Sequence, residues 1–215
     1  MSKSILIMGE SGSGKTTSMR NLNPAETFYI DCDKKGLSWK DWRKQYSEEK
    51  KNYMATSDKN VVMSLLSKIS NEQPQIKVVV IDTLNAIMID DEFARMKEKS
   101  YDKWQELAYS IYGIINMCNV LRKDLTCLLV MHSITEKDEV TGIPWTHART
   151  SGKKLEKIVV ESKLTTVLLA KNVNGKYMFI TKSDGTSTAK TPFGAFQEDT
   201  VENDIVKVLD ALKEY

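Results

Sequence analysis

The sequence predicts an α/β fold in which a mainly parallel central sheet is flanked by helices. Three observations lead to this expectation. Short runs rich in β-branched residues and leucine alternate along the chain with segments of helical periodicity. Two of these runs, at 76–82 and 125–131, are nearly continuous apolar stretches, as in parallel strands that are covered on both faces. In the last third, a two-residue turn signal predicts an antiparallel hairpin instead.

Length and composition favour one compact domain over residues 1–215. A chain of 215 residues can bury a full core, and its hydrophobic content of 41% is ordinary for a soluble globular protein. The 3 cysteines are widely spaced and there are only 2 histidines, which argues against a disulfide framework and a zinc site. No apolar run approaches the ~20 residues of a membrane span. We therefore expect a cytoplasmic protein with no membrane partner.

The first two thirds of the chain supply the elements of the parallel sheet. A helix is expected from Lys15, directly after the first strand and a glycine-rich turn. A second helix is expected over 103–121, where apolar side chains fall on one stripe. Strands and helices that alternate in this way form βαβ units. The expected strands are, in order, 4–8, 27–31, 76–82 and 125–131.

The last third has a different pattern. Two strand-like runs flank Asn174-Gly175, a type I′ turn signal, and predict an antiparallel hairpin. An acidic helix is expected over 199–215, since Glu202 completes a capping-box pattern near its start. Residues 133–153 have the least pattern of any segment. We expect a long, mobile loop there.

The stretch "GESGSGKTT", residues 9–17, matches the phosphate-binding pattern G-x-x-x-x-G-K-[ST] in full. Its glycines let backbone N–H groups converge on phosphate oxygens, Lys15 reaches the β- and γ-phosphates, and the Thr16 hydroxyl ligates Mg²⁺. The motif requires a strand before it and a helix after it, and both are expected here. We therefore predict an ATP site with Mg²⁺, GTP being the alternative nucleotide, formed by Gly9, Glu10, Ser11, Gly12, Ser13, Gly14, Lys15, Thr16 and Thr17.

A second metal-binding carboxylate is expected at the end of an apolar strand. Asp82 is the favoured candidate, because the run that it ends is long and β-branched. The run at 86–92 is an alternative, since it also ends in acidic residues. If it were the metal strand, its Asp91-Glu92 would resemble the Asp-Glu pair of the AAA+ ATPases. The favoured prediction is that Thr16 and Asp82 hold Mg²⁺.

A carboxylate that could orient a water molecule must come from elsewhere, because Thr83 stands next to Asp82 where an adjacent glutamate is usual. The expected strand at 27–31 runs into "YIDCDKKG". Asp31 and Asp33 share a face if the strand continues that far. Carboxylates just past the carboxyl end of a strand lie where ligands bind in open α/β sheets. The alternative is that both are solvated acids in a turn.

Three later segments resemble successive motifs of the RecA fold in order and spacing: "FYIDCD" (28–33), "VVVIDTLNAI" (78–87) and "LLVMHSITEKD" (128–138). The last of them is similar to the G-H-V-T-K segment of the RadA/Sms branch. "AKTPFGAF" (189–196) resembles the K-N-R-F-G motif of that branch. The resemblance extends over 5–196. In size and layout the chain resembles the short, single-domain RecA-like ATPases that bacteriophages encode for recombination and replication.

The resemblance implies roles for three residues outside the phosphate loop. Asp33 falls at the position of the catalytic carboxylate, which is one methylene shorter here than the usual glutamate. His132 falls at the polar sensor position at the end of the fourth strand, although a histidine can also simply pack there. Lys190 matches the lysine that acts across a subunit boundary on a neighbour's ATP. The two residues after Lys190 depart from the pattern, and Lys182 is an alternative for that role.

The resemblance also implies single-stranded DNA as a partner, held by loops after the fourth strand. Cations and an aromatic side chain for base stacking occur there, although neighbouring acids dilute the charge. The expected DNA-binding residues are Trp145, Arg149, Lys153 and Lys154. A second basic and aromatic stretch carries Trp39, Trp42 and Tyr46 at helical spacing. Those three side chains form either one packed helix face or a stacking platform.

The resulting hypothesis is a Mg²⁺-dependent ATPase that is stimulated by single-stranded DNA and acts in phage-type recombination or replication. ATP would lie between subunits of a homo-oligomer, a filament or a ring, with a single-strand-binding or replication protein as a further partner. One alternative is a nucleotide or small-molecule kinase, although only five arginines occur and none cluster into a lid. The other is a module in which the nucleotide switches partner binding.

Overall fold

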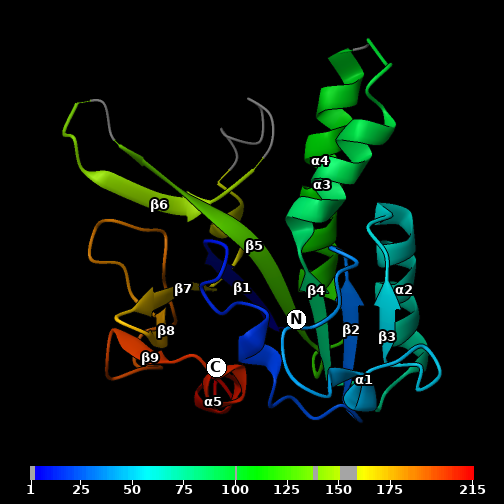
Figure 1. Cartoon of the computed structure of the whole chain (residues 1–215), viewed down its shortest axis with the longest axis horizontal. Coiled ribbons are helices and arrows are strands. Elements are labelled where there is room, and N and C mark those ends of the chain that lie inside the picture. The colour runs from blue at the N-terminus through cyan, green and yellow to red at the C-terminus, as the bar shows by residue number, and fades with distance from the viewer. Residues whose placement is uncertain (1–2, 100, 138–139, 151–158) are drawn as a thin grey trace.

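The structure is a computed structural model that describes residues 3–99, 101–137, 140–150 and 159–215. Its strands join in one sheet with the order β3-β2-β4-β5-β1-β7-β8-β9, and β6 pairs with the end of β5 (Figure 1). The strands are β1 (Lys3–Gly9), β2 (Thr27–Asp31), β3 (Tyr53–Ala55), β4 (Val78–Asp82), β5 (Thr126–Lys137), β6 (Pro144–Ala148), β7 (Thr166–Val173), β8 (Lys176–Ile180) and β9 (Thr200–Glu202).

Five helices and two short 3-10 turns, η1 and η2, accompany the described part of the sheet. They are η1 (Thr17–Met19), α1 (Trp42–Gln45), α2 (Lys59–Glu72), α3 (Leu84–Ala94), α4 (Tyr101–Val120), η2 (Val160–Lys163) and α5 (Ile205–Ala211). Strands β3, β2, β4, β5, β1 and β7 are parallel, and β8 and β9 extend the sheet in antiparallel fashion. The predicted fold class is therefore confirmed.

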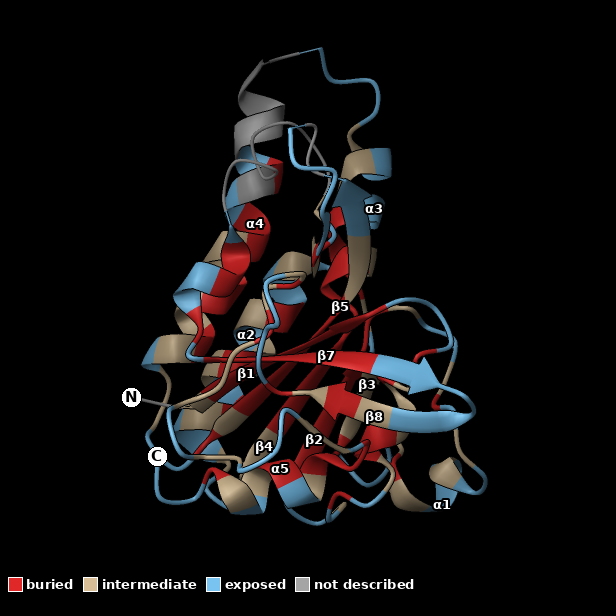
Figure 2. Ribbon diagram, turned by 90° about the vertical axis from the view of Figure 1, so that its left-hand side faces the viewer, coloured by how far each residue is buried: buried red, intermediate tan, exposed pale blue. Residues whose placement is uncertain are grey.

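The core has two layers, one on each face of the sheet. Alternate side chains of a strand point to opposite faces. Leu6 and Met8 accordingly lie in the cluster under α2, α3 and α4, whereas Ile5 and Ile7 lie in the cluster under η1, α1 and α5. Figure 2 shows buried residues along the central strands. The parallel strands are covered on both faces, as their apolar sequence predicts.

The hairpin predicted at Asn174-Gly175 is confirmed. The two residues have φ angles of 54° and 83°, the left-handed values that a type I′ turn requires. Strands β7 and β8 pair on either side of them. The helix predicted over 103–121 is also confirmed as α4, whose apolar stripe is buried against the sheet.

The helix expected from Lys15 is wrong, because the chain forms only the short turn η1. Turn-forming residues follow directly after η1 and prevent a longer helix. Asn23 accepts a hydrogen bond from the backbone N–H of Ala25 at 3.1 Å, and Pro24 disfavours helical geometry at the residue before it. The phosphate loop is therefore followed by a turn that returns quickly to β2.

The acidic helix expected over 199–215 begins later than the sequence suggests. Thr200–Glu202 is strand β9, since its β-branched residues pair with β8. The carboxylate of Asp204 accepts a hydrogen bond from the N–H of Val206 at 3.0 Å and caps α5. The helix is therefore confined to the segment after Asp204.

The loop expected over 133–153 is also wrong for residues 133–137 and 144–148, which form strands. Ser133–Lys137 continues β5 and pairs with β6, and the hydroxyls of Thr135 and Thr146 lie 2.9 Å apart across the pair. Residues 138–139 and 151–153 lie outside the described part of the chain. What the sequence suggested as a loop is in this part a β-hairpin, which we call the β5–β6 hairpin.

The run at 86–92 is helical, which removes it as a metal-binding strand. It forms most of α3, and the Thr83 hydroxyl caps this helix by accepting from the N–H of Ala86 at 3.3 Å. Asp91 is paired with Lys59 of α2 at 2.8 Å, away from the phosphate loop. Within the described residues, no helix has both the length and the apolar character that crossing a bilayer demands.

The two faces of α4 give a direct test of the core. Ile114 is buried completely, so Ile114→Ala should lower the free energy of unfolding by about 2–5 kcal/mol through lost transfer energy and the cavity left behind. Tyr109 on the same helix is 71% exposed, and Tyr109→Ala should change it by less than about 0.5 kcal/mol. Urea unfolding of both variants measures this. Equal effects would contradict the packing of α4.

Candidate functional site

The carboxyl ends of β1, β2 and β4, together with the middle of β5, bring the predicted site residues to one edge of the central sheet. Gly9 at the end of β1 pairs with His132 of β5. Asp82 at the end of β4 pairs with Val130 of β5 and, on its other side, with Asp31 of β2. Because β5 lies between β1 and β4, His132 stands between the phosphate loop and Asp82. This is the edge where open α/β sheets bind ligands.

The phosphate loop has the backbone shape that only glycine accepts easily. Gly12 and Gly14 have φ angles of 77° and 91°. At Gly9 a Cβ would lie 2.5 Å from the Ser13 Oγ and 2.7 Å from the Ala170 carbonyl oxygen, so no side chain fits there. The loop therefore leaves its backbone bare, as close approach to phosphate oxygens requires.

The side chain of Lys15 folds back onto the start of the phosphate loop. Its Nζ donates to the carbonyl oxygens of Gly9 and Glu10 at 2.8 and 2.7 Å. Burial lowers the pKa of Lys15 to about 8, and the nearby carboxylate of Asp82 partly opposes this. A phosphate anion would favour the charged ammonium, so the site gains from a polyanionic ligand.

Asp82 is the most constrained group of the site. The hydroxyls of Thr16 and Tyr29 donate to its Oδ2 at 2.7 and 2.6 Å, while its Oδ1 is buried without a partner among the described residues. Burial raises the pKa of Asp82, and the two hydroxyl donors counteract part of that rise. A buried, unpartnered carboxylate oxygen beside a threonine hydroxyl fits Mg²⁺, which prefers oxygen ligands. Thr16 and Asp82 would hold the ion.

The two acids at the end of β2 have different surroundings. Asp31 is buried and accepts hydrogen bonds from the Gly36 N–H and the Tyr53 hydroxyl at 2.7 and 2.8 Å. Asp33 accepts from the Thr83 hydroxyl at 2.9 Å through one oxygen and pairs with Lys35 through the other. Asp31 therefore supports the loop after β2, while Asp33 remains beside Thr83 at the site edge.

His132 is held through its backbone. Its N–H donates to the Asn85 Oδ1 at 2.8 Å, and the Asn85 amide in turn donates to the Arg149 carbonyl at 2.8 Å. Partial burial and the nearby Lys15 lower the pKa of His132. The imidazole is therefore mainly neutral near pH 7.

One open cleft of about 570 Å³ joins these groups, a size that suits a small-molecule ligand. Thr16, Asp82, Thr83 and His132 line one part of it, and Asp33 is connected to this part by the hydrogen bond that it accepts from Thr83. Sequence reasoning missed Tyr29 and Thr83, whose roles depend on strand register. It also missed a second part of the lining, which includes Arg20, Tyr177, Glu202 and Asn203.

Neither lysine considered for a trans role lines this cleft. Lys190 pairs through its backbone with Val167 of β7, at 2.9 and 2.8 Å. Lys182 is paired with Asp199 at 3.1 Å. Both lie on the β7–β8 side of the sheet, and a role on a neighbour's nucleotide stays a prediction.

The residues expected to bind DNA are only partly described. Trp145 is 42% exposed on β6, opposite Glu136 of β5. Arg149 is exposed, and its backbone N–H donates to the His132 carbonyl at 2.7 Å. Lys153 and Lys154 lie outside the described residues. The structure thus brings the base of the β5–β6 hairpin next to His132.

The aromatic stretch after β2 packs instead of forming a platform. Trp39 and Tyr46 contact the ring of Tyr29 with centroid separations of 6.3 and 5.7 Å, and Tyr46 is 1% exposed. The packing interpretation is confirmed, although only Trp42–Gln45 is helical. This cluster backs the Tyr29 side chain that holds Asp82.

A protein-family model described as an AAA domain matches residues 1–193 of the chain. The chain belongs to this AAA-domain family. It is therefore a P-loop ATPase that binds ATP, in agreement with the phosphate loop and cleft described above. No curated protein matches the chain.

Asp82→Asn in this AAA-domain protein should raise the stability of the fold and lower the rate of ATP turnover. A carboxyl with a raised folded pKa stabilises the fold fully below its unfolded pKa of ~3.9, and that contribution is lost as pH rises through the folded value. At pH 7 the variant should therefore unfold at higher urea concentration than the wild type without nucleotide, and this advantage should vanish in acid. ATP turnover should fall about 100-fold or more.

Urea midpoints between pH 4 and pH 8 and a steady-state ATPase assay measure both effects. The matched control is Asp124→Asn, at an exposed position away from the cleft. A variant that is less stable than the wild type at pH 7 would show that burial of the Asp82 charge does not cost stability.

Proposed function

We propose that this P-loop ATPase is a RecA-like protein that hydrolyses ATP and acts on single-stranded DNA in phage-type recombination or replication. The observation that carries hydrolysis is the position of Asp33. One of its oxygens is held by Thr83, which lines the cleft beside Asp82, and the other is paired with Lys35, which also lines the cleft. A carboxylate placed in this way can orient a water molecule.

The proposed mechanism divides the work among the residues of the strand ends. The phosphate loop and Lys15 bind the phosphate chain, and Thr16 and Asp82 hold the Mg²⁺. When bound, Mg²⁺ neutralises charge on the β- and γ-phosphates. Asp33 accepts a hydrogen bond from the attacking water and aligns it. The neutral imidazole of His132 contacts the γ-phosphate and relays its presence through the backbone.

The proposed DNA contact uses the β5–β6 hairpin. This hairpin extends from the carboxyl edge of the sheet, the edge that carries the phosphate loop (Figure 1). Its base is joined to the sensor position by the hydrogen bond from the Arg149 N–H to the His132 carbonyl. Trp145 offers an exposed ring for base stacking, and Arg149 offers a cation. Nucleotide state and DNA contact would be coupled through β5.

The proposed assembly is a homo-oligomer, with Lys190 acting on the ATP of a neighbour. Phe193, three residues further on, has a fully exposed side chain. In the proposed assembly the neighbouring subunit would cover this side chain. The same loop would then provide both an apolar anchor and a lysine across the boundary.

Asp33→Asn should lower ATP turnover by about 100-fold or more and leave ATP affinity within a few fold, because the side chain orients water but does not contact the loop. Phosphate release and equilibrium nucleotide binding measure the two quantities. Asp41→Asn is the control, since Asp41 is exposed and is paired with Lys44 on the surface. Turnover that survives in Asp33→Asn would remove the assigned role.

Trp145→Ala should weaken binding of a single-stranded oligonucleotide about tenfold, the usual value for a lost stacking contact. DNA should accelerate wild-type ATP turnover, and binding should weaken steeply with salt. Fluorescence anisotropy and ATPase rates with and without DNA measure these effects. Tyr215→Ala removes another exposed ring and is the control. No acceleration by DNA, or equal DNA binding by both variants, would contradict the proposed partner.

A further inference from the structure

The far end of the chain completes the cleft that begins at the phosphate loop. Tyr177 of β8, Glu202 of β9 and the following Asn203 line the same cavity as Gly14 and Thr16. Figure 1 shows why: β8, β9 and α5 fold back beside the turn that follows β1. The phosphate motif therefore accounts for only part of the lining. It does not say which part of a ligand the remaining lining residues would contact.

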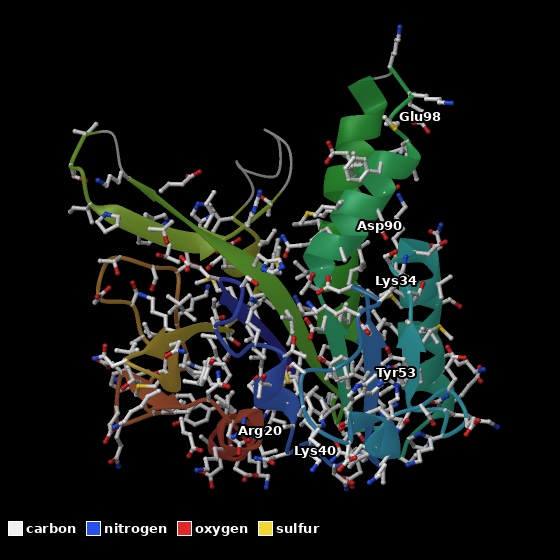
Figure 3. All side chains as sticks on the ribbon, viewed as in Figure 1. Arg20, Lys34, Lys40, Tyr53, Asp90 and Glu98 are labelled. Carbon is white, nitrogen blue, oxygen red and sulfur yellow. The ribbon has the colours of Figure 1, made fainter. Side chains whose placement is uncertain are left out.

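Hydrogen bonds fasten this C-terminal segment to the turn after the phosphate loop. The Arg20 Nη1 donates to the carbonyl oxygens of Thr17 and Asn203 at 3.1 and 2.9 Å. The Asn21 amide donates to the Asp204 carboxylate at 2.7 Å. Figure 3 places Arg20 at α5 accordingly. The position of Asn203 relative to the loop is thus set by two independent contacts.

The side chain of Asn203 has an unused donor. The residue is 3% exposed, and its Nδ2 has no hydrogen-bond partner among the described residues. Its amide lies against the loop, because a Cβ built on Gly14 would be 3.2 and 3.3 Å from the Oδ1 and Nδ2. A buried donor without a partner costs free energy unless a ligand supplies an acceptor. Because Asn203 lines the cleft, a bound ligand is the candidate acceptor for this donor.

Tyr177 places an aromatic ring next to that amide. Its side chain is 47% exposed, and its Cδ1 would be 2.8 Å from a Cβ at Gly14. The ring thus lies against the phosphate loop on one side and remains accessible in the cleft. An accessible aromatic ring is the usual surface for a nucleobase.

The distribution of charge in the cleft indicates which end of a nucleotide would lie at which end of the cleft. Lys15 and Lys35 line the part of the cleft near Asp82, where a phosphate chain is stabilised. At the other end, Tyr177 and Asn203 are uncharged, the Arg20 guanidinium is engaged with the Thr17 and Asn203 carbonyls, and the Glu202 carboxylate is paired with Lys207. The remote part of the cleft therefore suits the neutral half of a nucleotide.

We propose that Tyr177 and Asn203 form the nucleoside subsite: the Tyr177 ring stacks on the base, and the Asn203 Nδ2 donates to an acceptor of the base or ribose. A purine is favoured, because its larger ring stacks over more of the tyrosine. This inference rests on the proposed nucleotide site at the phosphate loop. It adds that Tyr177 of β8 and Asn203 after β9, both outside that motif, hold the nucleoside.

Competition against a fluorescent ATP analogue tests the proposal, with ATP and inorganic tripolyphosphate as the two competitors. Tripolyphosphate contacts only the phosphate loop. Tyr177→Ala should weaken ATP binding about tenfold or more, and Asn203→Leu about three- to tenfold, with tripolyphosphate binding unchanged within twofold. Tyr177→Phe keeps the ring and should keep ATP affinity. Tyr109→Ala, at an exposed position of α4, is the control.

The outcomes separate the inference from the proposed function. If ATP and tripolyphosphate bind the wild type equally, or if Tyr177→Ala binds ATP as well as the wild type does, the nucleoside lies elsewhere. If a variant loses both ligands in equal measure, its side chain supports the loop and does not contact a nucleoside. If neither ligand displaces the analogue from the wild type, the nucleotide site itself is wrong.

Discussion

The buried carboxylate of Asp82 is the interaction on which the site depends. Its Oδ2 receives the hydroxyls of Thr16 and Tyr29, so one charge connects the phosphate loop, β2 and β4. Burial of this charge lowers the stability of the fold. A cation bound at the unpartnered Oδ1 would offset that loss. The aromatic packing behind Tyr29 keeps the arrangement in place. A functional site that lowers the stability of the fold without its ligand is a common trade-off in proteins.

The antiparallel end of the sheet gives the cleft its second half. Strands β8 and β9 extend the parallel core, and the turn after β9 is fastened to the phosphate loop through Arg20. The loops that follow this hairpin carry Lys190 and the exposed Phe193. The loop that carries Lys190 and Phe193 joins β8 to β9, and Asn203 follows β9 directly. Nucleotide binding and assembly would share one structural element.

The parts of the fold that could be predicted are those with local signals. A sequence signal within a short stretch of neighbouring residues predicts each of these parts: the central strands, α4, the phosphate loop and the turn at Asn174-Gly175. The helix expected from Lys15 failed because turn formers follow it. The run at 86–92 has a strand-like composition, but the cap at Thr83 begins a helix there. Tyr29 and Asn203 could not be found in this way, because their partners are 53 and more than 180 residues away in the chain.

The central claim is that water receives the γ-phosphoryl group of ATP at the edge formed by Asp33, Asp82 and His132. Turnover in ¹⁸O-labelled water, followed by mass spectrometry of the released phosphate, tests it most directly. Hydrolysis at this edge should release inorganic phosphate that carries one oxygen from the solvent, with or without single-stranded DNA. A phosphoryl group that appears instead on a nucleoside monophosphate or another acceptor, with no labelled phosphate, would contradict it and identify a kinase.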